Sequence, residues 1–192
     1  MNVLLYSRAF FPQLGGIERA SMLLATELAR RGHSVRVATR VAADPAQDRP
    51  LPFEVVRGSR AGAFRQAARA ADLIHTNGYS LEAVALAALN ARPCVVTHAG
   101  FQSCCLEGSG LHGDARCGLH LARCVALTSG HLGLARATRQ LARHLAGRLG
   151  LHAVRANVAV SQAVATAIRA PRTTVIWNCV DTAIFCPGLP GG

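Results

Sequence analysis

The stretch Gly15-Gly16-Ile17-Glu18-Arg19 indicates the fold of this chain most directly. It follows the apolar run Val3-Leu4-Leu5-Tyr6, which predicts a buried strand, and it begins an amphipathic segment over 16–31, which predicts a helix. The first N–H groups of a helix have no partner within it, and a glycine has no side chain to block an approaching phosphate. Taken alone, Gly15 and Gly16 are compatible with phosphate binding, and a flexible loop that merely starts a helix is the alternative.

Strand-like and helix-like segments alternate along the rest of the chain. This order predicts right-handed crossovers and a parallel sheet with helices on both faces, the Rossmann-like doubly wound α/β class. Strands are expected over 3–7, 34–39, 53–57, 72–76, 94–97, 157–160 and 173–177, and helices over 16–31, 61–70, 80–90, 131–149 and 161–169. A nicotinamide cofactor is disfavoured, because the first loop lacks Gly-x-Gly-x-x-Gly and no acidic residue follows the second strand, where Ala38-Thr39-Arg40 stands.

The composition fits one folded domain. With 51% apolar and 16% charged residues among 192, the chain has enough apolar side chains for a core and is not of the disordered class. The net charge of +11 comes from arginine alone, since the sequence contains no lysine. These arginines are scattered and aromatic residues make up only 5%, so no nucleic-acid partner is expected, whereas peripheral contact with an anionic membrane stays open.

The sequence predicts a cytoplasmic protein. Met1-Asn2 leads directly into the first strand with no signal peptide, and the longest apolar stretch, Ala83 to Leu89, is too short to span a bilayer. Seven cysteines without an export signal are expected to be mostly reduced thiols. A peripheral position at the inner face of the membrane remains compatible with these features.

Six segments, in their order and spacing, resemble one family. They are Phe11-Pro12 with Gly15-Gly16-Ile17-Glu18, Leu28-Ala29-Arg30-Arg31-Gly32-His33-Ser34-Val35, Asp72-Leu73-Ile74-His75, Val96-Thr97-His98-Ala99-Gly100, Ala159-Val160-Ser161, and Val175-Ile176-Trp177-Asn178-Cys179-Val180-Asp181. Over essentially the whole chain they resemble the N-terminal domain of family 4 glycosyltransferases, retaining enzymes of the two-domain GT-B architecture.

The resemblance implies sugar transfer, of hexosyl type, from a nucleotide sugar to a glycan or lipid-linked acceptor with retention of anomeric configuration. In such enzymes the N-terminal domain mainly holds the acceptor, and the C-terminal domain holds the nucleotide. No metal or other cofactor is required beyond the nucleotide sugar, which is a co-substrate. The alternative is a stand-alone, non-catalytic module that binds a glycan or lipid acceptor, or one that acts with a donor domain on another chain.

By position in the family pattern, His98 is expected to donate a hydrogen bond to the transferred sugar, as the catalytic residue, and Gly15 and Gly16 to face the donor diphosphate. The remaining residues expected to line the substrate cleft are Glu18, His75, Asn77, Gly78 and Asn178. For His98 a structural, hydrogen-bonded histidine is the alternative. His33 follows a helix C-terminus, where a cation complements the helix dipole, and is interpreted as structural.

Two departures from the family pattern bear on activity. The acidic donor-binding motif of the family belongs to a second domain that this sequence lacks, so the isolated chain is expected to be inactive. Cys179 stands where the family usually has glycine. The glycosyltransferase-like domain is expected over 1–186, and the Pro- and Gly-rich residues 187–192 are interpreted as a linker-like tail.

A Gly-rich stretch after the strand at 94–97 gathers four cysteines, with His112 and His120 interleaved. These are Cys104, Cys105, Cys117 and Cys124, all expected in a loop. Four thiolates could bind zinc, but the Cys-x2-Cys pairs typical of such sites are absent, so packed or unligated thiols are the preferred interpretation. A subset of family 4 has a comparable cysteine-containing insertion after this strand.

The predicted helix over 131–149 has arginines on one side. Arg136, Arg139 and Arg143 lie opposite a face with Leu134, Leu141 and Leu145. A solvated face above a packed one is the simpler interpretation. The functional alternative is an Arg-rich face against anionic lipid, which would suit a lipid-linked acceptor.

Overall fold

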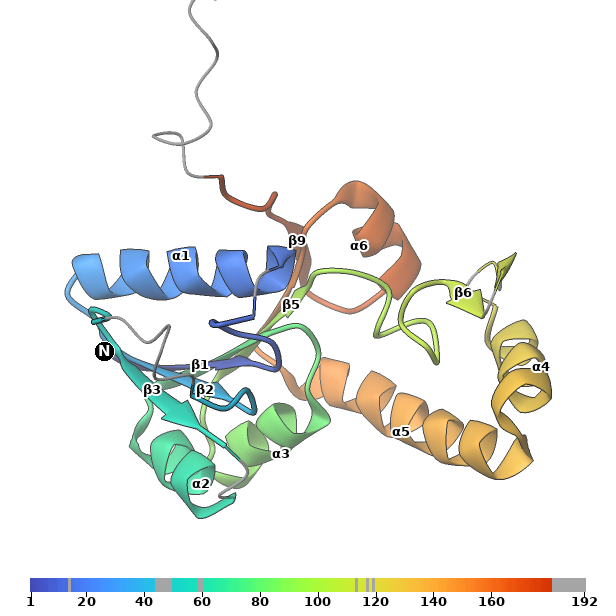
Figure 1. Ribbon diagram of the computed structural model, residues 1–192, viewed down its shortest axis with the longest axis horizontal. Coiled ribbons are helices and arrows are strands. Elements are labelled where there is room, and N and C mark those ends of the chain that lie inside the picture. The colour runs from blue at the N-terminus through green and yellow to red at the C-terminus, as the bar shows by residue number, and fades with distance from the viewer. Residues whose placement is uncertain are drawn as a thin grey trace, which may run out of the picture.

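The computed structural model describes residues 1–13, 15–43, 50–58, 61–112, 114–116, 118 and 120–180. Its main feature is a parallel seven-stranded sheet in the order β3-β2-β1-β4-β5-β8-β9 (Figure 1). The strands are β1 (Asn2–Ser7), β2 (Ser34–Thr39), β3 (Glu54–Arg57), β4 (Leu73–Asn77), β5 (Cys94–His98), β8 (Ala156–Ala159) and β9 (Thr173–Val175). Each of the seven expected strands is present, so the predicted Rossmann-like class is confirmed.

The helices cover both faces of the sheet. They are α1 (Gly16–Arg30), α2 (Ala61–Ala70), α3 (Leu81–Leu89), α4 (Leu121–Leu132), α5 (Leu134–Ala153) and α6 (Gln162–Ile168). In Figure 1, α1 lies on one side of the sheet, and α2, α3 and α5 lie on the other. No helix in the described part of the chain is both long and apolar enough to cross a bilayer.

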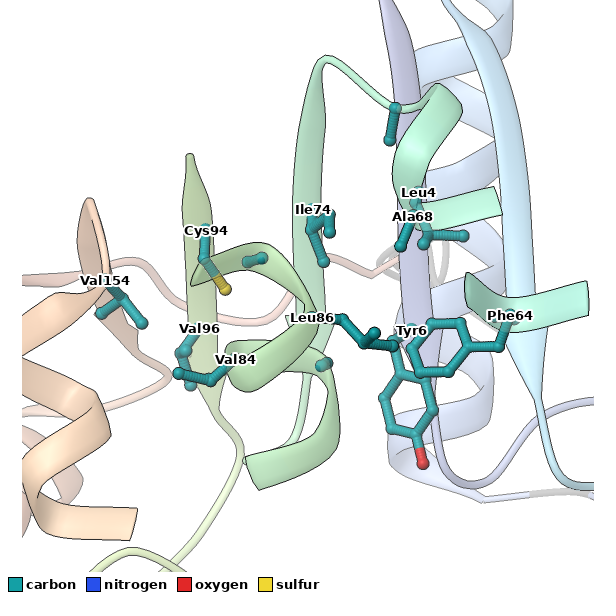
Figure 2. Packing of buried hydrophobic residues seen from close by; sticks show 14 of the residues in the cluster. Leu4, Tyr6, Phe64, Ala68, Ile74, Val84, Leu86, Cys94, Val96 and Val154 are labelled. Carbon is teal, nitrogen blue, oxygen red and sulfur yellow. The ribbon is translucent and has the colours of Figure 1, made fainter. Parts of the chain in front are cut away.

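The larger apolar core fills the face that α2, α3 and α5 cover (Figure 2). Leu4, Ile74 and Val96 from three adjacent strands are almost fully buried there, as expected for a parallel sheet whose two faces are covered. Tyr6 stacks on Phe64 of α2 with ring centroids 5.1 Å apart. A second, smaller core beneath α1 includes Leu5, Val37 and Phe10 from the strands and from the loop after β1.

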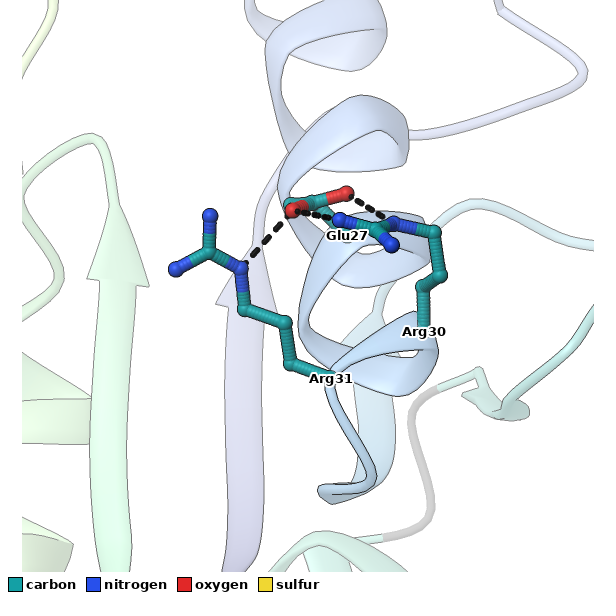
Figure 3. A network of polar contacts seen from close by, with 3 residues as sticks. All are labelled: Glu27, Arg30 and Arg31. Atoms are coloured by element: carbon teal, nitrogen blue, oxygen red, sulfur yellow. Dashed lines mark hydrogen bonds and ion pairs between the residues drawn. The ribbon is translucent and has the colours of Figure 1, made fainter.

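Helix α1 ends at Arg30, one residue before the end of the predicted segment 16–31. The N–H of Gly32 donates to the carbonyl of Ala29, and the N–H of His33 donates to that of Leu28, which together close the last turn. In this turn Glu27 pairs with Arg30 at 2.8 Å and with Arg31 at 2.7 Å (Figure 3). These groups are exposed, so the pairs mainly satisfy surface charge and add little stability.

The segment between β5 and β8 differs from the prediction. The helix expected over 131–149 is present as α5, and it is preceded by a helix that was not expected, α4, which meets α5 at Gly133. Gly133 has φ +84°, a conformation that glycine adopts without strain and that turns the chain between the helices. A short hairpin of β6 (Leu111–His112) and β7 (Ala115–Arg116) precedes them. Cys124 therefore lies in α4, and the expectation that it sits in a loop was wrong.

Candidate functional site

The predicted site residues gather at the carboxyl edge of the sheet. Asn77 is the last residue of β4, His98 is the last of β5, and β1 ends at Ser7 directly before the glycine loop. These strand ends are neighbours, since Ser7 lies opposite Asn77, and Asn77 lies opposite Thr97. In open parallel sheets ligands bind beyond this edge.

The start of α1 lies at this edge with Gly15 as its N-cap. Gly15 is extended and makes no side-chain cap, so the first N–H groups of α1 have no side-chain acceptor at the N-cap. A Cβ on Gly15 would lie 2.4 Å from Oε2 of Glu18, because that carboxylate folds back over the helix start. A Cβ on Gly16 would meet nothing within 4 Å. The site is thus open at Gly16, and Glu18 currently occupies the positive end of the helix dipole.

A buried polar network fixes the start of α1 to the strand ends. Asn77 donates through Nδ2 to Oγ of Ser21 at 2.8 Å and to the carbonyl of Ile17 at 3.4 Å. Ser21 Oγ lies 2.8 Å from Oγ of Ser7, which itself donates to the carbonyl of Ala9 at 2.6 Å. Asn77 therefore fixes the position of the start of α1 through buried hydrogen bonds. This differs from the expectation that it lines the cleft.

Sequence reasoning missed Ser7 and Ser21 in this network. A signal for Ser21 was present, since it is a polar residue four positions after Ile17 on the apolar face of α1. The loop between β1 and α1 has two further anchors. Phe10 is fully buried, and Arg57 at the end of β3 donates to the carbonyl of Phe11 at 2.7 Å. The glycine loop is thus held from three strands.

His75 and Gly78 shape the neighbouring strand end. Nε2 of His75 lies 2.8 Å from Oγ1 of Thr97, and burial lowers the pKa of His75 to about 4, so the ring is neutral at physiological pH. Gly78 has φ +82°, and its N–H donates to the carbonyl of Thr97 at 2.9 Å. The contacts of both residues with Thr97 join β4 to β5, and Gly78 also begins the turn before α3.

His98 is buried and both of its ring nitrogens have partners. Nε2 lies 3.0 Å from Oδ1 of Asn157, and Nδ1 lies 2.8 Å from Oγ of Ser103. The Asn157 amide is oriented by its Nδ2, which donates to the carbonyls of Pro171 and Leu151. Oδ1 can only accept, so Nε2 of His98 carries the hydrogen, and Nδ1 of the neutral ring accepts from Ser103.

This arrangement bears on the predicted role of His98. Only 1% of the residue is exposed, and burial lowers the pKa of its ring, so the imidazole is uncharged. In this conformation the ring lies beneath the sheet edge and does not face open solvent. Contact with a sugar stays a prediction, and it requires the loop that carries Ser103 to move.

The cysteine-containing segment packs as an apolar cluster. Cys105 and Cys124 are buried against Phe101, Leu106 and Leu127. Cys117, the third cysteine of the predicted group, lies outside the described residues. Within the described part of the chain no group of three or more His, Cys, Asp or Glu residues could hold a metal ion.

The carboxyl edge also carries a cleft that the sequence did not reveal. Its volume is about 710 Å³, and it lies between the ends of β1 and β2, the start of α3, the segment around 105–107, and α5. The charged residues along its walls are Arg8, Arg40, Glu82, Glu107, Arg136 and Arg143. Of the predicted lipid-facing arginines, Arg136 and Arg143 thus line a cleft at the sheet edge, while Arg139 is exposed elsewhere on α5. Asn178 is also exposed, beyond the end of β9.

The sequence model of Glycosyltransferase Family 4 matches residues 14–184. The chain belongs to glycosyltransferase family 4. The match includes the glycine loop from Gly15, the helix start and every strand of the sheet after β1. Among curated proteins, no sequence matches this family 4 chain significantly.

Solved glycosyltransferases share the fold of this family 4 chain. HepE from Anabaena, solved in complex with UDP, superposes with a TM-score of 0.56 at 19% identity, over 96% of this chain and 46% of its own. A ugt transferase from Siraitia grosvenorii, also in complex with UDP, gives 0.50 at 15% identity, over 91% of this chain and 47% of its own. At these identities the likeness concerns the fold alone. The chain spans about half the length of these proteins.

Proposed function

We propose that this chain supplies the acceptor-binding half of a retaining glycosyltransferase, which moves a hexosyl unit from a nucleotide sugar to an acceptor. The observation that carries the proposal is the start of α1. It is open at Gly16 and is fixed to the carboxyl edge by Ser7, Ser21 and Asn77. Family membership and the UDP complexes of the two similar structures support a nucleotide sugar as the ligand.

In this proposal the backbone N–H groups after Gly15 bind the donor diphosphate. The helix dipole and the first N–H groups, which have no side-chain acceptor at the N-cap, favour an anion there, and Gly16 leaves room for it. The carboxylate of Glu18 occupies this place in the structure, so it must turn away when phosphate binds. The mechanism needs no cofactor besides the nucleotide sugar.

His98 is proposed to contact the transferred sugar through Nδ1. Because Asn157 holds Nε2, the nitrogen on the side of the Ser103 loop is the one that a ligand can reach. Nδ1 accepts a hydrogen bond in this tautomer, so a sugar hydroxyl would replace the hydroxyl of Ser103. The role differs from the expected one, in which His98 donates. Replacing His98 by Ala should reduce transfer by about 10²-fold, because the sugar loses a contact that positions it, and thermal unfolding of the same variant checks that its fold remains.

The experiment that tests the proposal is transfer of labelled sugar from nucleotide sugars. It compares the product of the whole gene with the 192-residue chain, and the product's anomeric configuration is determined by NMR. Transfer with retention by the product of the whole gene supports the proposal, and inactivity of the shorter chain supports its role as one half. Inversion would contradict the retaining mechanism.

A second function is a non-catalytic module that binds a glycan or lipid acceptor, alone or with a donor domain on another chain. One observation favours it, since strand ends and helices of this single domain, namely β1, β2, α3 and α5, form walls of the 710 Å³ cleft. Such a module would bind an acceptor without a second domain. Acceptor binding without sugar transfer by the product of the whole gene would select this function.

Peripheral contact with a membrane is also proposed, on the outer face of α5. Leu134, Leu145 and Leu149 lie on one side of that helix and are 70%, 47% and 74% exposed. Exposed leucines in a row are typical of helices that lie on a bilayer. Replacing Leu145 and Leu149 by Gln should weaken binding to anionic vesicles, and unchanged binding would contradict the contact.

A further inference from the structure

The walls of the 710 Å³ cleft carry an excess of positive charge. Arg8 follows β1, and Arg40 follows β2. Arg136 and Arg143 lie about two turns apart on α5 and so face the same side of the helix. Four guanidinium groups thus meet two carboxylates, those of Glu82 and Glu107. His144, also in the wall, adds no charge, because burial and the nearby Arg148 lower its pKa.

Three of these arginines are not used in ion pairs within the described structure. Arg40 pairs with Glu82 at 2.5 Å. No ion pair among the described residues involves Arg8, Arg136 or Arg143, although they lie around one cleft. Like charges gathered around a concave surface raise the local potential and attract an anion. The start of α3, which opens into the same cleft at Ser80 and Leu81, adds the positive end of a helix dipole.

Gln140 adds a second, independent feature. It lies on α5 between Arg136 and Arg143, and it also lines the cleft. Its Oε1 is buried and has no hydrogen-bond partner in the described structure. A buried carbonyl oxygen without a donor is costly, and such atoms commonly await a ligand or water. The atom can only accept, so the missing partner is a donor such as a hydroxyl group.

We propose that this cleft binds the acceptor through a phosphate group, which Arg8, Arg136 and Arg143 neutralise, and through a hydroxyl that donates to Gln140. The inference rests on the proposed function and names its acceptor class, a phosphorylated sugar or a lipid-linked sugar phosphate. Guanidinium groups suit phosphate because their planar donors match its oxygens. A volume of about 710 Å³ is of the size that holds a ligand of one or two sugar units.

The test is titration calorimetry of the 192-residue chain with glucose 1-phosphate and with inorganic phosphate. The double variant Arg136→Gln, Arg143→Gln should bind both at least about tenfold more weakly, since each arginine makes a charge-assisted contact. Arg139→Gln, on the same helix but outside the cleft, is the matched control and should bind as the original chain does. Gln140→Leu should weaken the binding of glucose 1-phosphate more than that of inorganic phosphate, which has no sugar hydroxyl.

The outcomes separate this inference from the proposed function. If the folded chain binds neither probe, or if the double variant binds like the original, the inference is wrong. Loss of binding in Gly16→Ala alone would place the anion at the start of α1 and overturn the cleft site, while leaving the proposed function intact. Binding to vesicles of phosphatidylcholine with and without phosphatidic acid distinguishes a lipid-linked acceptor from a soluble sugar phosphate. If the phosphate belongs to a lipid, the double variant should also lose vesicle binding. If the acceptor is soluble, vesicle binding should not change in the double variant.

Discussion

At the scale of single residues, two histidines of the sheet are neutral: His98, which is buried at the end of β5, and His75, which is half-buried in the middle of β4. Burial lowers the pKa of His75 to about 4, and it also lowers the pKa of His98. In the unfolded chain both rings titrate near pH 6.5. Between these values the unfolded chain binds more protons than the folded chain, so acidification favours unfolding.

We therefore expect the free energy of unfolding to fall as the pH falls below about 6.5, and the contribution of His75 to be fully lost near pH 4. His75 alone accounts for up to about 3 kcal/mol of the loss. Urea unfolding at a series of pH values measures it. His75→Gln, which keeps a donor for Thr97, should flatten the curve over this range. The paired carboxylate of Glu27, whose pKa is lowered to about 2, acts only below about pH 4.5. If the unfolding free energy of His75→Gln depends on pH as steeply as that of the original chain, the loss does not come from His75.

At Gly16 the effect of an added methyl group on stability can be measured apart from its effect on ligand binding. A Cβ at Gly16 meets nothing within 4 Å, and alanine favours the helix by up to about 1 kcal/mol over glycine. Gly16→Ala should therefore leave thermal stability unchanged or slightly raised. If phosphate approaches the backbone there, the same methyl group should weaken nucleotide-sugar binding. A variant with unaltered affinity in the product of the whole gene would remove Gly16 from the donor site.

At the scale of elements, the contact of α5 with the start of α3 depends on Gly147. Tyr79 donates from its hydroxyl to the carbonyl of Gly147 at 3.1 Å, and burial raises the pKa of this tyrosine to about 12. A Cβ on Gly147 would lie 3.0 Å from Cε1 of Tyr79 and 3.1 Å from its hydroxyl oxygen. The helix can approach the ring this closely only without a side chain at that position.

Gly147→Ala should thus destabilise the protein by about 1–3 kcal/mol, because the ring or the helix must shift. Gly130→Ala is the matched control. Gly130 also lies within a helix, α4, but a Cβ there would meet nothing within 4 Å, so alanine should stabilise by up to about 1 kcal/mol. Chemical denaturation of both variants measures the difference. Equal stability changes in Gly147→Ala and Gly130→Ala would contradict the packing role of Gly147.

Local patterns predicted the elements of the sheet, but not the segment between β5 and β8. The strands there have only two residues each, too short for any periodic signal. Glycines and cysteines between 100 and 124 suggested a loop, and the start of α4 has no Ser, Thr, Asp or Asn cap, since His120 stands at that position. Only the later part of this segment was predicted, since the spacing of Leu and Arg residues indicated a helix over 131–149, which is present as α5.

At the scale of the whole molecule, the strand order places distant segments at one edge. The glycine loop and the ends of β4 and β5 were predicted to meet, because parallel strands end at the same side. The 710 Å³ cleft was not predictable in this way. Arg8 and Arg40 follow the paired strands β1 and β2, but Arg143 joins them only through the packing of α5 against α3, and no periodicity in the sequence encodes that contact. The buried state of His98 likewise depends on Ser103 and Asn157, which no local pattern links to it.

The central claim is that the ligands of sugar transfer bind at the carboxyl edge of this sheet. Backbone amide NMR of the isotope-labelled chain, titrated with UDP and then with glucose 1-phosphate, tests it most directly. The account predicts that UDP shifts the amides of Gly15 and Gly16, and that glucose 1-phosphate shifts those around Arg8, Ser80 and Arg136. Shifts confined to the opposite, amino-terminal edge of the sheet, or no shifts with either ligand, would contradict it.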